Sequence, residues 1–161
     1  MHFKKREMDN HKKWMAKAIE EAMKSAQNGD GPVAAIIVQN DQIISVGRNT
    51  KTSENSGFAH AELNALLAAK PLLGREPEGC ILYSTFEPCA MCLGAITFSG
   101  IRKIVYGSSD PIGGSITMFK QHETYSKWMP EVIGGVMKDE CDALKLLTTS
   151  YGKNTTRAFT V

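Results

Sequence analysis

The sequence predicts a three-layer α/β/α sandwich, in which helices cover both faces of a mixed five-stranded sheet. Two adjacent strand-like segments come first, and strands then alternate with helices, which favours right-handed crossovers and parallel pairing for the later strands. The chain has 161 residues, 42% of them hydrophobic and 22% charged, close to the values of an average globular domain. Residues 1–161 are therefore expected to form a single domain, with flexible segments at 1–10 and 152–161.

The first half of this pattern begins with a helix and a hairpin. Residues 11–27 repeat apolar side chains at helical spacing, and Asn28-Gly29 marks the end of that helix. The nearly continuous apolar run 32–38 is typical of a strand covered on both faces. Asn40-Asp41 is a turn signal, so residues 42–47 are predicted to return beside the first strand as the second half of a hairpin.

A polar loop and alternating elements follow the hairpin. Residues 48–57 are polar, whereas residues 59–70 are rich in Ala, Leu and Glu and predict a helix that Pro71 ends. The remaining predicted elements are a strand at 80–84, a helix at 89–98, a strand at 103–107, a helix at 116–128, a strand at 131–136 and a helix at 138–151.

The composition also bears on location and partners. No run of residues approaches the ~20 apolar residues that a membrane-spanning helix needs, so no membrane partner is expected. Residues 1–13 are polar and charged, which excludes a secretory signal, and the cytoplasm, where thiols stay reduced, is the expected location. The net charge of +2 neither requires nor excludes a nucleic-acid partner.

Two short motifs, each at the start of a predicted helix, carry the ligands of a metal site. The first is His60-Ala61-Glu62, and the second is Pro88-Cys89-Ala90-Met91-Cys92. An imidazole and two thiolates suit Zn²⁺, and two cysteines three residues apart share one face of a helical turn. The positive end of a helix also favours the thiolate over the thiol. We therefore predict that His60, Cys89 and Cys92 bind Zn²⁺.

Three protein ligands leave one tetrahedral position open, as in catalytic rather than structural zinc sites. The other cysteines, Cys80 and Cys141, lack the spacing of a partnered ligand pair. Two alternatives remain at this point. A zinc-stabilised binding module would have a closed site, and a thioredoxin-like redox pair of Cys89 and Cys92 would leave the histidine and glutamate of the first motif without a role.

Glu62 is the candidate catalytic residue. In a continuous helix, residues two apart point about 200° apart, so Glu62 does not simply face the same ion as His60. Its carboxylate reaches a metal-bound water if His60 lies in the first turn, and it then serves as general base and general acid. The alternative role is to complement the dipole of the helix.

These motifs resemble the H-x-E…P-C-x-x-C signature of the zinc-dependent cytidine deaminase superfamily, and the likeness extends over nearly the whole chain. The most similar branch contains tRNA adenosine deaminases, guanine deaminases and cytosine deaminases. The resemblance implies a cytidine deaminase-like fold, zinc held by His60, Cys89 and Cys92, and proton transfer by Glu62. The implied reaction replaces the exocyclic amino group of a base with oxygen and releases ammonia.

Four further residues are candidates for substrate contacts. The resemblance implies that Asn49 contacts the substrate and that Ala61 offers its backbone N–H to the base, although Asn49 is equally suited to a turn after a strand. Phe58 and Phe86 are candidates for stacking on the base, with ordinary core packing as the alternative. Family members often read Pro-Thr-Ala before the histidine, where this chain has Gly57-Phe58-Ala59.

The sequence favours a free nucleobase, nucleoside or related aminated heterocycle of the guanine or cytosine type as substrate. A tRNA-specific adenosine deaminase acting at the anticodon wobble position is the alternative. Residues 110–115 look shorter than the equivalent loop of tRNA-editing enzymes, and residues 152–157 are only mildly basic. The basic residues of the N-terminal segment are either phosphate contacts or a solvated face: Lys4, Lys5, Arg6, Lys12 and Lys13.

The resemblance also implies a homodimer. The candidate interface residues are large and apolar, and core packing explains them equally well: Met118, Phe119, Trp128 and Met129.

Overall fold

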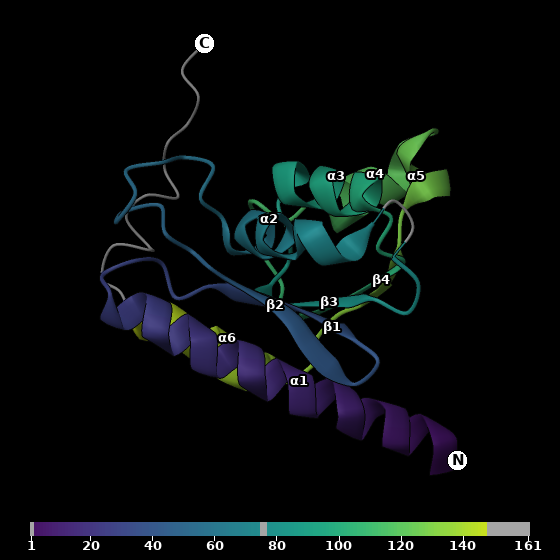
Figure 1. The fold of residues 1–161 in the computed structure, drawn as a ribbon, viewed down its shortest axis with the longest axis horizontal. Coiled ribbons are helices and arrows are strands. Elements are labelled where there is room, and N and C mark those ends of the chain that lie inside the picture. Colours follow the sequence, from purple (N-terminus) through teal and green to yellow (C-terminus); the bar gives the residue numbers. More distant parts are fainter. Residues whose placement is uncertain (1, 75–76, 148–161) are drawn as a thin grey trace.

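The computed structural model describes residues 2–74 and 77–147, and it confirms a mixed five-stranded sheet with helices on both faces (Figure 1). The strand order across the sheet is β2-β1-β3-β4-β5. The strands are β1 (Ala34–Gln39), β2 (Gln42–Arg48), β3 (Ile81–Phe86), β4 (Lys103–Ser108) and β5 (Glu131–Ile133). Strand β1 runs antiparallel to β2 and to β3, while β3, β4 and β5 are parallel, as the alternation of elements predicts.

The helices form the two outer layers. They are α1 (His2–Gln27), α2 (Ala61–Leu73), α3 (Ala90–Ser99), α4 (Ile116–Gln121), α5 (Tyr125–Trp128) and α6 (Lys138–Leu144), followed by a 3₁₀ turn at Lys145–Leu147. Helices α1 and α6 cover one face of the sheet, and the other helices cover the opposite face (Figure 1). No helix in residues 2–74 and 77–147 is long and apolar enough to cross a membrane.

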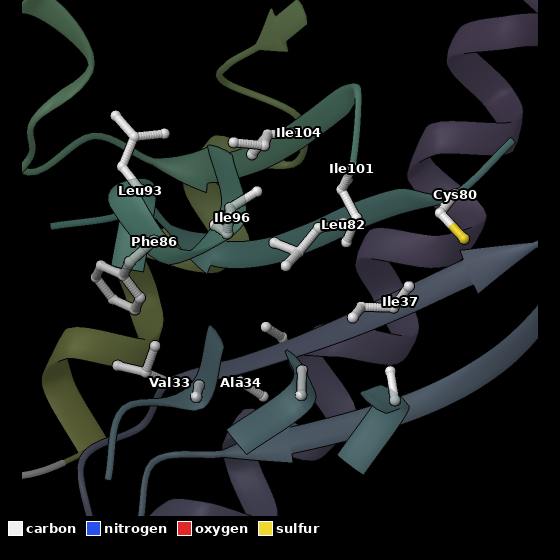
Figure 2. Packing of buried hydrophobic residues seen from close by; sticks show 14 of the residues in the cluster. Val33, Ala34, Ile37, Cys80, Leu82, Phe86, Leu93, Ile96, Ile101 and Ile104 are labelled. Carbon is white, nitrogen blue, oxygen red and sulfur yellow. The ribbon is translucent and has the colours of Figure 1, made fainter. Parts of the chain in front are cut away.

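The core lies on both sides of the sheet because neighbouring strand residues point in opposite directions. Ile37, Leu82 and Ile104 belong to the cluster that packs beneath α2 and α3 (Figure 2). Their chain neighbours Ile36, Tyr83 and Val105 pack with Trp14 and Met15 of α1. This double burial explains why the first strand reads as a continuous apolar run.

Three predicted helices differ from the structure. Helix α1 begins at His2 rather than at residue 11, because its exposed first turns carry no apolar repeat for the sequence to show. Helix α2 continues through Pro71 to Leu73, because Leu73 is buried in the core and its packing outweighs the tendency of the proline to end the helix. The single helix predicted at 116–128 is two helices, because His122 Nδ1 accepts the backbone N–H groups of Thr124 (3.1 Å) and Tyr125 (3.3 Å).

The C-terminal predictions are only partly covered by the described residues. Strand β5 ends at Ile133 instead of residue 136, and Gly135 follows with a positive φ of 82° that a strand does not allow. The predicted helix at 138–151 is α6 and the 3₁₀ turn up to Leu147. Residues 148–151 and the predicted tail 152–161 lie outside the described residues.

Candidate metal centre and active site

The predicted metal ligands meet where α2 and α3 begin. His60 is the N-cap of α2, Cys89 is the N-cap of α3, and Cys92 lies in the first turn of α3. His60 Nδ1 is 3.7 Å from Cys89 Sγ and 3.6 Å from Cys92 Sγ. The three ligand atoms all lie within 4.8 Å of one another. The residues His60, Cys89 and Cys92 are thus positioned to bind one ion.

The spacing of these donor atoms fits Zn²⁺. A tetrahedral zinc with Zn–S bonds of about 2.3 Å and Zn–N bonds of about 2.0 Å separates sulfur from nitrogen by roughly 3.5 Å. The two sulfur–nitrogen distances in this site, 3.7 and 3.6 Å, are close to that value. Two thiolates and one neutral imidazole also balance the charge of the ion and leave a fourth position open.

The two thiols have very different proton affinities. A hydrogen bond from the Cys92 thiol, helped by His60 and opposed by burial, lowers the pKa of Cys89 to about 4. The same hydrogen bond raises the pKa of Cys92, and burial and the nearby charge of Glu62 raise it further. Cys89 is therefore a thiolate at neutral pH, ready to bind a cation.

Glu62 is the second residue of α2, and its side chain is only 4% exposed. Ser84 Oγ, from β3, donates a hydrogen bond of 3.1 Å to Glu62 Oε1. Burial raises the pKa of Glu62, and the charge of Cys89 adds to that effect. A carboxyl group with a raised pKa beside the metal ligands is suited to accept and return a proton.

Asn49 forms the turn that follows β2. Its Oδ1 accepts the backbone N–H of Lys51 at 3.1 Å, and its carbonyl accepts a hydrogen bond of 2.6 Å from Ser25 Oγ. The turn role proposed for this residue is therefore present, and contact with the substrate stays a prediction. Ala61, which is fully buried, opens α2, where backbone N–H groups lack an acceptor within the helix.

The two candidate stacking residues lie in different environments. Phe86 is 4% exposed and packs in the core near Val33 and Leu93 (Figure 2). Phe58 is 74% exposed and lies two residues before His60. The two rings do not form one exposed wall, and stacking on a base stays a prediction for Phe58.

Two residues beneath the site were missed by the sequence analysis. Ser84 donates a hydrogen bond to Glu62, and its only signal in the sequence was a hydroxyl side chain inside the strand that leads to the Cys89 motif. Gly47 lets β2 approach the start of α2: a Cβ there would lie 2.0 Å from the carbonyl oxygen of Ala61 and 2.2 Å from the nitrogen of Ala65. Only glycine therefore allows this contact.

The basic N-terminal residues lie far from these ligands within one chain. Glu7 of α1 pairs with Lys103, the first residue of β4, at 3.4 Å, whereas the ligands follow the last residues of the parallel strands. Lys13 pairs with Asp41 in the β1–β2 turn at 3.2 Å. The first turns of α1, which carry Lys4, Lys5 and Arg6, thus lie near the ends of the strands opposite to those that the metal ligands follow (Figure 1).

One histidine and two cysteines at two helix N-termini, with a buried glutamate beside them, define a catalytic-type zinc site in an α/β/α fold. Residues 8–108 match the family described as the cytidine and deoxycytidylate deaminase zinc-binding region. The chain belongs to this family of zinc-dependent enzymes, whose members hydrolyse C–N bonds of nucleobases or nucleosides, and Zn²⁺ is its cofactor.

Three known proteins illustrate the range of the family. The chain is 37% identical to the tRNA-specific adenosine deaminase of Bacillus subtilis (strain 168) over 135 residues, 81% of this chain and 83% of that protein. It is 38% identical to the guanine deaminase of the same organism over 101 residues, 62% of this chain and 65% of that protein. A structure from a study of A-to-I editing by tRNA:A34 deaminases at the wobble position has a TM-score of 0.69 and 31% identity, covering 79% of this chain and 94% of the other.

These likenesses change the order of the two substrate predictions. The sequence features alone favoured a free nucleobase or nucleoside, but of the two Bacillus subtilis relatives the tRNA-specific adenosine deaminase is similar over 81% of this chain and the guanine deaminase over 62%. The tRNA alternative therefore has the better support.

Proposed function

We propose that this protein is a tRNA-specific adenosine deaminase that converts adenosine to inosine at the anticodon wobble position. The observation that carries the proposal is the likeness to tRNA adenosine deaminases over 81% of the chain, which includes the complete set of His60, Glu62, Cys89 and Cys92.

The residues of the site suit hydrolytic deamination. Zinc, when bound by His60, Cys89 and Cys92, supplies the Lewis acidity that makes water a nucleophile at neutral pH. Glu62 accepts a proton from the attacking water and gives it to the ring nitrogen next to the reacting carbon. Glu62 then delivers a second proton, from the added hydroxyl group, to the amino group, which leaves as ammonia. The hydrogen bond from Ser84 aims the carboxylate throughout.

The rim residues bind the substrate in this proposal. Asn49 and the backbone N–H of Ala61 hold the polar edge of the base, and the exposed ring of Phe58 stacks on its face. Phe86 lies in the core, which matches the packing alternative for this residue, and the proposal does not depend on its predicted contact with the base.

The second candidate is deamination of a free purine such as guanine. The chain is also 38% identical to a guanine deaminase over 62% of its length, and the basic residues of α1 lie at the opposite ends of the strands from the ligands. A nucleobase needs no phosphate contacts, whereas tRNA would have to find its basic partners elsewhere.

We also propose that the protein is a homodimer. Of the predicted interface residues, Met118 and Trp128 are exposed, whereas Phe119 is buried and Met129 packs against the core. Further large apolar side chains are exposed on the same layer of helices: Leu67 and Leu72 on α2 and Phe98 on α3. The rings of Phe98 and Trp128 are in edge contact, with centroids 6.0 Å apart, so part of this surface is continuous. Phe98→Glu is expected to give a monomer in sedimentation analysis; an unchanged dimer would exclude this face.

A substrate panel tests the proposed activity. Zinc-loaded protein is incubated with a tRNA anticodon arm that has adenosine at the wobble position, and separately with guanine, cytosine, cytidine and adenosine. We expect inosine in the RNA and no ammonia from the small molecules, with Glu62→Gln as the inactive control. Ammonia from guanine without inosine in the RNA would replace the proposal with the second candidate.

A further inference from the structure

The segment 110–116, which leads from β4 to the first residue of α4, lies directly against the turn that carries the metal ligand Cys89. Gly114 pairs with Cys89 in an isolated antiparallel bridge. The backbone N–H and the hydroxyl of Ser115 both donate to the carbonyl of Pro88, at 3.1 and 3.0 Å. These contacts hold the backbone of Pro88 and Cys89, and the position of the Cys89 sulfur depends on that backbone.

The carboxylate of Glu87 accepts a backbone N–H at each end of this segment. Glu87 Oε2 accepts the backbone N–H of Asp110 at 3.2 Å, and Glu87 Oε1 accepts the backbone N–H of Ile116 at 3.3 Å. The Glu87 backbone is itself held, because its N–H donates to the carbonyl of Ser108 at 2.8 Å. Glu87 therefore ties β4 through its backbone N–H, and the two ends of the segment 110–116 through its side chain, to the turn that carries Cys89.

Gly114 shows how closely these parts fit. A Cβ at this position would lie 2.4 Å from the carbonyl oxygen of Asp110 and 2.5 Å from Glu87 Cδ. Neither contact is possible without moving the segment or the carboxylate. The absence of a side chain at Gly114 is therefore a requirement of the packing around Glu87.

We propose that Glu87 is a positioning residue for the zinc site. By holding the segment 110–116 against Pro88 and Cys89, it fixes Cys89 Sγ at the distance from His60 that zinc requires. Cys89 needs this support because it is the N-cap of α3: its carbonyl accepts the backbone N–H of Leu93 at 2.8 Å, but its own N–H has no acceptor within the helix. The inference concerns metal binding and stands whether the substrate is tRNA or a free base.

The test measures zinc affinity by competition with a chromophoric chelator, using the full chain. We expect Glu87→Ala to weaken zinc binding about 10–100-fold, the usual effect of losing a group that orients a ligand. Glu87→Gln keeps one acceptor oxygen and is expected to lose less. Gly114→Ala displaces the segment by another route and is expected to weaken zinc binding as well. The absorption of Co²⁺-substituted Glu87→Ala is expected to change, because the cobalt–sulfur geometry changes.

Three control variants separate positioning from general stability. Glu123→Ala removes an exposed carboxylate, and Gly94→Ala adds a methyl group whose nearest neighbour is 4.0 Å away; both are expected to bind zinc as the parent does. Ile104→Val weakens the core without touching the segment and is expected to lower the unfolding temperature alone.

Folded Glu87→Ala with zinc affinity within about twofold of the parent and an unchanged cobalt spectrum would overturn the inference. If Glu87→Ala does not fold, parent-like affinity in both Glu87→Gln and Gly114→Ala would overturn it instead. A loss in Ile104→Val as large as that in the Glu87 variants would show that zinc binding follows overall stability, which also contradicts the proposal.

Discussion

Replacing Asp30 with alanine is expected to release the loop that leads from β2 to His60. Asp30 follows α1 and is only 2% exposed. Its Oδ1 accepts the backbone N–H groups of Thr52 and Ser53, at 2.8 and 3.0 Å. Asn49 and Phe58 are the proposed substrate contacts, and this one carboxylate anchors the loop that lies between them.

The magnitude follows from the two hydrogen bonds. A bond to a charged acceptor contributes about 1.5–3 kcal/mol. Thr52 and Ser53 are exposed and share one oxygen, so water replaces part of the loss and the lower value applies to each, roughly 3 kcal/mol together. Because 1.4 kcal/mol is a factor of ten, the open loop becomes about 100-fold more populated. Asp30→Asn keeps a neutral acceptor and is expected to lose only about 1 kcal/mol.

Amide hydrogen exchange at Thr52 and Ser53 measures this opening directly. Protection is expected to fall about 100-fold in Asp30→Ala and far less in Asp30→Asn, by the free-energy differences above. KM should rise while bound zinc is unchanged, since the ligands do not touch Asp30. Asp9→Ala, an exposed carboxylate on α1, is the matched control. Unchanged protection in folded Asp30→Ala, or equal losses in both Asp30 variants, would refute the reasoning.

Three further predictions test the site and its surroundings. Glu62→Gln should keep one zinc per chain by metal analysis and lose about 10²–10⁴-fold or more in turnover; substantial activity would contradict the proton-transfer role. Cys80→Ser combined with Cys141→Ser should leave the zinc content unchanged, because neither thiol belongs to the ligand cluster; loss of zinc would favour a closed structural site. Burial, and then the charge of Lys103, lowers the pKa of His11 below 6.5, so the unfolded chain binds this proton more readily than the folded chain. Stability is therefore expected to be complete above pH 6.5 and to fall as the pH drops through 6.5, and thermal unfolding should show less of this loss in His11→Gln.

The elements that bury an apolar pattern could be predicted from the sequence, and those defined by single hydrogen bonds could not. The buried run that became β1 and the apolar repeat of α1 after residue 11 were both recognised. The break between α4 and α5 depends on the His122 ring, which accepts two backbone N–H groups. A single histidine within a helical stretch produces no repeating pattern in the sequence, so this contact could not be predicted.

The relation between His60 and Glu62 shows a similar limit at the site. Both residues could be identified from their types and from their place at the start of a predicted helix, like the cysteine motif, but helical geometry places residues two apart on different sides. The structure resolves this conflict because His60 is not helical: its ψ of 149° is extended, and the helix begins at Ala61. The imidazole and the carboxylate therefore approach the same place from a cap and a first turn.

The loops around the site are anchored by carboxylates that bind backbone groups only. Asp30 holds the loop before His60, and Glu87 holds the segment beside Cys89; each accepts two backbone N–H groups. Because the anchored groups are backbone, exposed side chains of these loops can vary without loss of the anchor, whereas Gly114 cannot. The exposed Phe58 and Ile112 lie on these two loops. Substrate choice can therefore change through such residues while the zinc ligands and Glu62 keep their geometry. A shared ligand signature thus predicts the reaction, whereas the residues of the loops determine the substrate.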